Sequence, residues 1–103
     1  MKSINYEYAV NLQQNEAKWQ EREEQLHEIM RYFTKNTILQ FIAMEVNFRA
    51  MELCEYINKG DRGEFFASEI DRFTSDFETT KTAYEKSGIS EQFAELAKKI
   101  SEK

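Results

Sequence analysis

The sequence predicts an all-α fold: an antiparallel helical bundle of about four helices, three of them long and one short at the C-terminus. Proline is absent from the 103 residues and only three residues are glycine, whereas a β-rich domain of this size needs many turn residues. Apolar residues also recur at helical spacing along most of the chain. Since the length is that of one domain, we expect residues 1–103 to form a single helical domain.

The first predicted helix covers about residues 3–34. Its apolar residues recur every seven positions and predict a thin apolar stripe on a largely polar helix: Leu12, Trp19, Leu26 and Phe33. A weak break follows at residues 34–37, where Thr and Asn are poor helix formers. An alternative stays open, namely a single helix over residues 4–58, which would be about 80 Å long and would need a second copy to cover it.

The second predicted helix, residues 38–57, is mostly apolar and is expected to be central in the bundle. Thr37 followed by Gln40 is a capping-box pattern and predicts its start. Asn58 and Gly60 predict its end, because glycine is common just after a helix.

Charged residues on this helix form a narrow polar stripe. Glu45, Arg49 and Glu52 are spaced by four and three positions, so that Glu45 and Arg49 can pair. Such charges are costly in lipid, which argues against a membrane span. The remaining apolar surface exceeds what a thin bundle needs, and we expect self-association through four of its residues: Phe41, Met44, Phe48 and Met51.

The third predicted helix begins near Asp61, whose side chain can cap it, and ends at Ser87 and Gly88. Its core-facing seam has spacings of four and three: Phe66, Ile70, Phe73, Phe77, Thr80 and Tyr84. The last helix is short, is capped by Ser90, and carries four apolar residues: Ile89, Phe93, Leu96 and Ile100.

Charge and the N-terminal sequence limit the partners. The net charge is −5, from 14 basic and 19 acidic residues. The basic residues are scattered, so we expect neither direct nucleic-acid binding nor membrane binding. The first residues lack the apolar core of a signal peptide, and we expect a cytoplasmic protein.

The residues that usually carry chemistry are scarce. Glu24 and His27 match Glu-x-x-His, but a di-iron bundle needs two such motifs and His27 is the only histidine. Cys54 is the only cysteine and lies in an apolar run, which predicts a buried thiol. No glycine-rich phosphate loop is present. We therefore expect no catalytic residue, no metal and no cofactor, and not an enzyme.

By elimination, the sequence favours a small non-enzymatic protein-interaction module of the adaptor, chaperone or inhibitor type. It would form a homodimer and dock on a larger protein. Trp19 has two interpretations: a seam residue packed on the second helix, or an exposed aromatic anchor among polar neighbours. The second makes five residues candidates for partner binding: Trp19, Tyr8, Leu12, Arg22 and Glu23.

Two other functions remain as alternatives. In one, the chain is an acidic decoy that blocks a nucleic-acid-binding protein with glutamates of the first helix: Glu16, Glu21, Glu23, Glu24 and Glu28. In the other, it is a small-molecule sensor in which Asn47 and Arg49 orient a ligand between helices.

Overall fold

In a computed structural model of the chain, residues 2–87 and 91–102 are described, with side chains for residues 13–86 and 91–102. The all-helical prediction is confirmed for this part of the chain. It contains five helices where about four were expected: α1 (Lys2–Lys35), α2 (Thr37–Ile42), α3 (Met44–Asn58), α4 (Glu64–Ser87) and α5 (Glu91–Ser101).

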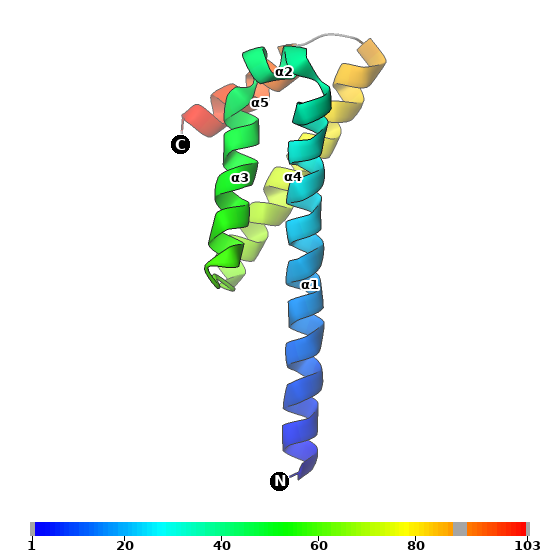
Figure 1. Cartoon of the computed structure of the whole chain (residues 1–103), viewed down its shortest axis with the longest axis vertical. Coiled ribbons are helices and arrows are strands. Elements are labelled where there is room, and N and C mark those ends of the chain that lie inside the picture. The colour runs from blue at the N-terminus through cyan, green and yellow to red at the C-terminus, as the bar shows by residue number, and fades with distance from the viewer. Residues whose placement is uncertain (1, 88–90, 103) are drawn as a thin grey trace.

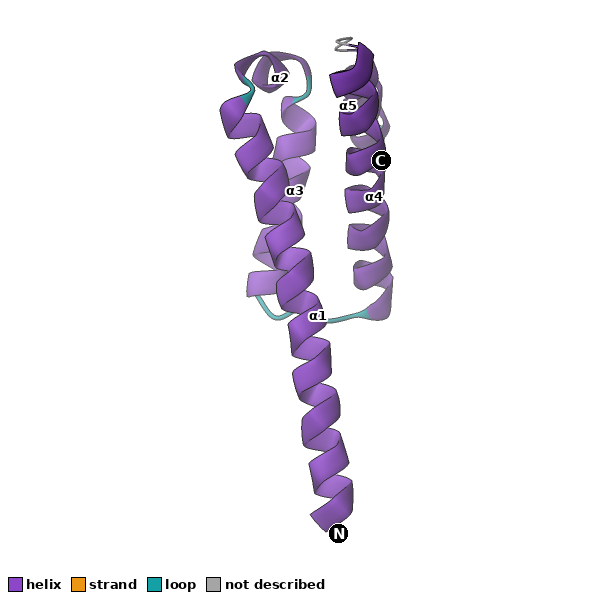
Figure 2. Cartoon of the chain, turned by 90° about the vertical axis from the view of Figure 1, so that its right-hand side faces the viewer, coloured by secondary structure: helices purple, strands orange, loops and turns teal. Residues whose placement is uncertain are grey.

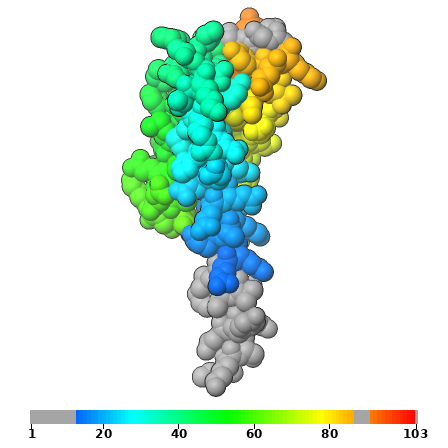
Figure 3. Space-filling view, turned by 45° about the vertical axis from the view of Figure 1, so that its right-hand side comes forward, coloured from blue at the N-terminus to red at the C-terminus, as the bar shows by residue number. Residues whose placement is uncertain are grey.

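The helices form two layers. Helices α1 and α3 run side by side in opposite directions, and the short α2 lies across their shared end (Figure 1). Helices α4 and α5 make the second layer (Figure 2). On the face shown in Figure 3, α1 runs between α3, in green, and α4, in yellow. The N-terminal end of α1 extends past the turn between α3 and α4, so the molecule is long and narrow, at 58 × 26 × 19 Å.

The predicted break after α1 is confirmed, but its capping differs from the prediction. Asn36 precedes α2, and its amide donates a hydrogen bond of 2.8 Å to the carbonyl oxygen of Tyr32. Gln40 donates another, also 2.8 Å, to the carbonyl oxygen of Phe33. The capping box at Thr37 is therefore wrong: Thr37 lies inside α2, and Gln40 instead satisfies a carbonyl in the last turn of α1.

The predicted helix over residues 38–57 is divided at Ala43, so a single central helix is wrong. Ala43 has φ −143° and ψ 36°, outside the helical region. Its N–H still donates to the carbonyl oxygen of Leu39, at 2.9 Å, and its own carbonyl accepts from the N–H of Val46, at 3.0 Å. The bend directs α2 across the α1–α3 pair. The side chains of Leu39, Ala43 and Val46 are all fully buried. The alternative of one helix over residues 4–58 is wrong for the same reason.

The predicted end of α3 is confirmed. Gly60 has φ +99°, and its N–H donates to the carbonyl oxygen of Ile57 while that of Asp61 donates to Tyr56. This is a Schellman cap, in which a residue without Cβ takes the left-handed position. Asp61 does not cap α4 as predicted, because its carboxylate accepts from the N–H of Gly63, before α4 begins.

The core lies between the two layers and contains most of the predicted seam residues. From α4, Phe66, Ile70, Phe73 and Phe77 are buried, while Thr80 and Tyr84 are half-buried. The rings of Phe33, Phe77 and Phe93 lie 5.7–6.3 Å apart and join α1, α4 and α5. Leu12, Ile89 and Ser90 lie outside the residues whose side chains are described.

Candidate functional site

Trp19 is buried, with 6% of its surface exposed. Its ring stacks on Phe66 at a centroid distance of 5.7 Å, and the guanidinium groups of Arg22 and Arg62 lie over it at 4.8 and 5.2 Å. The structure therefore contradicts an exposed aromatic anchor. The interpretation as a buried seam residue is confirmed, although Trp19 stacks on α4 and not on the second predicted helix.

Arg22 and Glu23, the other proposed partner-binding residues with described side chains, are half-buried and contact α4 and α3. Arg22 donates two hydrogen bonds to the carboxylate of Asp71, at 2.9 and 3.1 Å, and so connects α1 to α4. Glu23 is half-buried and approaches α3. Tyr8 and Leu12 lie outside the residues whose side chains are described.

The second set of candidates does share a surface. Along α3, Val46, Ala50 and Leu53 are fully buried or nearly so, which leaves the opposite side of the helix to solvent. That side and the adjoining turn of α2 carry all four residues proposed for self-association, between 42% and 83% exposed: Phe41, Met44, Phe48 and Met51. We call these four residues the apolar face.

A groove of about 650 Å³ opens beside the apolar face, between α3, the start of α4 and the end of α5. Phe48, Phe65 and Ile100 supply its apolar lining, and Phe65 is 84% exposed. Arg49 lies at its edge and pairs with both Glu52 and Glu69. Of the two partners that the spacing allows Arg49 in the polar stripe, Glu45 and Glu52, the structure shows the pair with Glu52, and Glu69 of α4 is a second partner.

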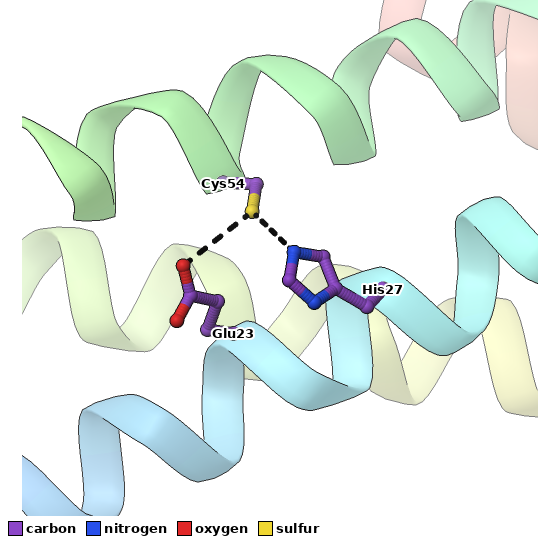
Figure 4. Close-up of side chains that lie close together, drawn as sticks. All are labelled: Glu23, His27 and Cys54. Atoms are coloured by element: carbon purple, nitrogen blue, oxygen red, sulfur yellow. Dashed lines mark hydrogen bonds between the residues drawn. The ribbon is translucent and has the colours of Figure 1, made fainter.

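A separate polar cluster lies between α1 and α3. The expected burial of Cys54 is confirmed, at 5% exposed, but its Sγ lies 3.2 Å from Nε2 of His27 and 3.9 Å from Oε2 of Glu23 (Figure 4). Burial raises the pKa of the Cys54 thiol, and the negative charge of Glu23 raises that pKa further.

Sequence reasoning missed this cluster. Glu23 and His27 are four positions apart and share one side of α1, and this spacing can be read from the sequence. The third member, Cys54, is 27 residues further along than His27, and only the antiparallel pairing of α1 with α3 brings it close.

No family model, curated protein or solved structure matches this chain. Within the described residues, no helix has both the length and the apolar character needed to cross a membrane.

Several residues that the two alternative functions would need already form ion pairs within the chain. Glu16 pairs with Arg62 at 3.1 Å and Glu24 with Arg31 at 2.6 Å, which weakens the negative field that a decoy needs. Among the described residues, Asn47 has a buried Oδ1 without a hydrogen-bond partner. Arg49, its proposed companion in a ligand site, is already held by two carboxylates.

Proposed function

We propose that this chain is a non-enzymatic protein-interaction module, of the adaptor, chaperone or inhibitor type, that pairs with a second copy of itself through the apolar face. The apolar face is the observation that carries the proposal. On α3, Met44, Phe48 and Met51 follow spacings of four and three, which is the pattern of a helix seam that packs on another helix, and Phe41 adds to them from the neighbouring α2. Large apolar side chains gathered on one exposed face are typical of interaction surfaces.

The total accessible surface of the chain is larger than that of a compact monomer, which supports an interface with a partner chain. The accessible surface is 7363 Å², about 1,300 Å² more than a compact monomer of this mass exposes. The radius of gyration is 16.5 Å, against about 13 Å for a compact chain of this length. Each partner in a stable protein complex loses about 800 Å², so the surplus is large enough for such an interface even though the projecting end of α1 contributes to it.

A second copy fits this face because the face can pair with itself. Phe48 lies between Met44 and Met51 on the exposed side of α3. If two copies of α3 packed in opposite directions about a two-fold axis, each Phe48 would meet its counterpart and each Met44 would meet the other chain's Met51. Arg49, beside the face, has its charge matched by Glu52 and Glu69 and adds no unpaired cation.

Docking on a larger protein would use the surface that the dimer leaves free. Apart from Phe48, the apolar lining of the groove comes from Phe65 on α4 and Ile100 on α5, which the α3–α3 contact does not use, and a helix with an apolar stripe is the kind of segment that such a groove accepts. In this arrangement, the dimer presents two copies of the groove to its partner.

Sedimentation of the wild-type chain and of Phe48→Glu tests the proposal. The wild-type chain should be a dimer at micromolar concentration. Phe48→Glu should be a monomer with an unchanged helical circular dichroism spectrum, because the substitution places a charge at the centre of the interface. Thr79→Glu, at an exposed position on α4, is the matched control and should remain a dimer. A wild-type chain that stays monomeric at tens of micromolar would overturn self-association.

Cross-linking locates the axis. Phe48→Cys should form a disulfide-linked dimer under mild oxidation, because residues near a two-fold axis meet their own copies. The wild-type chain, whose only cysteine is buried, and Thr79→Cys should not. Equal cross-linking of the two engineered cysteines would contradict the α3–α3 arrangement.

A further inference from the structure

Glu23, His27 and Cys54 place three different metal-binding atoms at one point between two helices. Their nearest ligand atoms, a carboxylate oxygen, an imidazole nitrogen and the thiol sulfur, all lie within 4.8 Å of one another. Figure 4 shows the carboxylate and the imidazole on α1 and both directed at the sulfur on α3. None of the three is part of the apolar face.

The two distances from the sulfur are close to those of tetrahedral coordination. Zinc binds sulfur at about 2.3 Å and nitrogen or oxygen at about 2.0–2.2 Å, so that neighbouring ligand atoms are about 3.3–3.6 Å apart. Here the sulfur-to-nitrogen distance is 3.2 Å and the sulfur-to-oxygen distance is 3.9 Å, which bracket that range. The Glu23 oxygen, at 3.9 Å from the sulfur and within 4.8 Å of the imidazole nitrogen, would have to move closer to share one ion with them.

The charges also favour a divalent cation. A thiolate and a carboxylate each carry one negative charge, and the imidazole is a neutral ligand, so a divalent ion gives a neutral site. Without a cation, the Cys54 thiol donates a long hydrogen bond, 3.9 Å, to the carboxylate of Glu23. A bound cation would replace this weak hydrogen bond by direct bonds to the sulfur and to the carboxylate oxygen.

The surroundings provide orientation and access. Glu24 Oε2 lies 4.0 Å from Nδ1 of His27 and is itself held by Arg31. A carboxylate on that side favours the tautomer that carries its hydrogen on Nδ1 and leaves the Nε2 lone pair for a metal. The side chain of His27 is 41% exposed, so that an ion can enter from solvent and water can fill a fourth position.

The alternative chemistry for a cysteine next to a histidine is nucleophilic attack. Cys54 lies in the interior of α3, where backbone N–H groups are used by the helix and none is left to stabilise an oxyanion. A carboxylate next to the sulfur also disfavours the free thiolate that a nucleophile requires. The cluster is therefore better suited to hold a cation than to attack a carbonyl.

We propose that Glu23, His27 and Cys54 bind one Zn²⁺ ion per chain, with water as the fourth ligand. Sulfur, nitrogen and carboxylate oxygen together suit zinc, whereas calcium and magnesium prefer oxygen alone. On binding, the thiol gives its proton to water and its sulfur binds the metal. The ion joins α1 to α3 across the hairpin and stabilises the folded chain, since the unfolded chain does not hold the three ligands together.

Spectroscopy of the whole chain tests the proposal. The metal-free, reduced protein should bind one Co²⁺ per chain and show the thiolate-to-cobalt charge-transfer band together with the intense visible bands of tetrahedral cobalt. Zinc should displace the cobalt and raise the melting temperature by several degrees. Cobalt spectra without a charge-transfer band would overturn the role of Cys54.

Three variants and a control test the ligand set. Cys54→Ser should abolish the charge-transfer band, and Glu23→Gln and His27→Gln should each weaken zinc binding by about tenfold or more in competition with a chromophoric chelator. Glu21→Gln, at an exposed position on the same helix, should bind zinc as the wild-type chain does. Equal affinity of Glu23→Gln, His27→Gln and the wild-type chain would overturn the site.

X-ray absorption of the zinc-loaded wild-type chain does not depend on any variant's folding. It should show one sulfur at about 2.3 Å and three nitrogen or oxygen neighbours at about 2.0–2.2 Å. A shell of oxygen and nitrogen alone would contradict the proposal.

Discussion

Arg22 donates two parallel hydrogen bonds to the carboxylate of Asp71, 49 residues further along the chain. The same guanidinium covers one side of the Trp19 ring. A planar cation is suited to both tasks, because its edge binds a carboxylate while its face stacks on an aromatic ring. One side chain therefore connects α1 to α4 in two ways.

Arg22→Ala should lower the free energy of unfolding by about 1–2 kcal/mol, through loss of the paired hydrogen bonds and of the contact with Trp19. Asp71→Asn should cost less than about 1 kcal/mol, because the Asp71 side chain is 55% exposed and exposed ion pairs contribute little. Urea denaturation of the two variants and of the double variant measures the coupling. Equal costs for both single variants would show that the contact with Trp19 contributes nothing.

Phe33 and Phe65 provide a contrast between a buried and an exposed phenylalanine. Phe33 is fully buried, and Phe33→Ala should cost about 3–5 kcal/mol through lost burial and the cavity left behind. Phe65→Ala should change stability by less than about 0.5 kcal/mol, since that side chain is 84% exposed. If Phe33→Ala does not fold, Phe33→Leu, with an expected cost of about 1 kcal/mol or more, provides the measurement. A similar cost for alanine at both positions would argue against the packing described.

Gly60→Ala should destabilise the chain by about 1–2 kcal/mol, because alanine is strained at positive φ. A Cβ at this position would meet no atom within 4 Å, so that the cost is one of backbone conformation alone. Gly63→Ala is the matched control: its Cβ would make an ordinary contact of 3.6 Å with Asp61, and its φ is not positive. Thermal denaturation should separate the two variants, and a harmless Gly60→Ala would contradict the Schellman cap.

Tyr32 should make stability depend on pH in the alkaline range. Burial raises the pKa of its hydroxyl above 10.0, and the charge of Glu85 adds to this effect. The folded chain then holds the proton more tightly than the unfolded chain. This contribution to stability is complete below pH 10 and is lost as the pH rises through the higher pKa of the folded state.

The difference between the wild-type chain and Tyr32→Phe isolates this contribution. The urea midpoint of the wild-type chain should fall more steeply above pH 10 than that of Tyr32→Phe. Parallel curves for the two proteins would show that the Tyr32 pKa does not change on folding.

Local patterns predicted the features that local chemistry determines. The seam of α4 and the Gly60 cap depend on spacing and on one residue without a Cβ, and both are visible in the sequence. The break at Ala43 is not, because alanine is the best helix former. It arises from tertiary packing, which buries Leu39 and Val46 on the two sides of the bend.

The surroundings of Trp19 and the contact between His27 and Cys54 could not be predicted, because both depend on how distant segments pack. Trp19 has polar neighbours in the sequence, yet one of them, Arg22, folds over the ring, and Arg62 does so from a distant turn. His27 and Cys54 looked unrelated because the register between α1 and α3 cannot be read from either helix alone. By contrast, the four residues proposed for self-association are exposed, which leaves that proposal open to test.

The burial of Trp19 gives the molecule a built-in optical probe. It is the only tryptophan in the chain, and its ring lies where α1 meets α4 and the turn that leads into it. Fluorescence on selective excitation therefore reports one junction, whereas far-ultraviolet dichroism averages over every helix. Comparing the two signals during denaturation separates helices that come apart from helices that unwind.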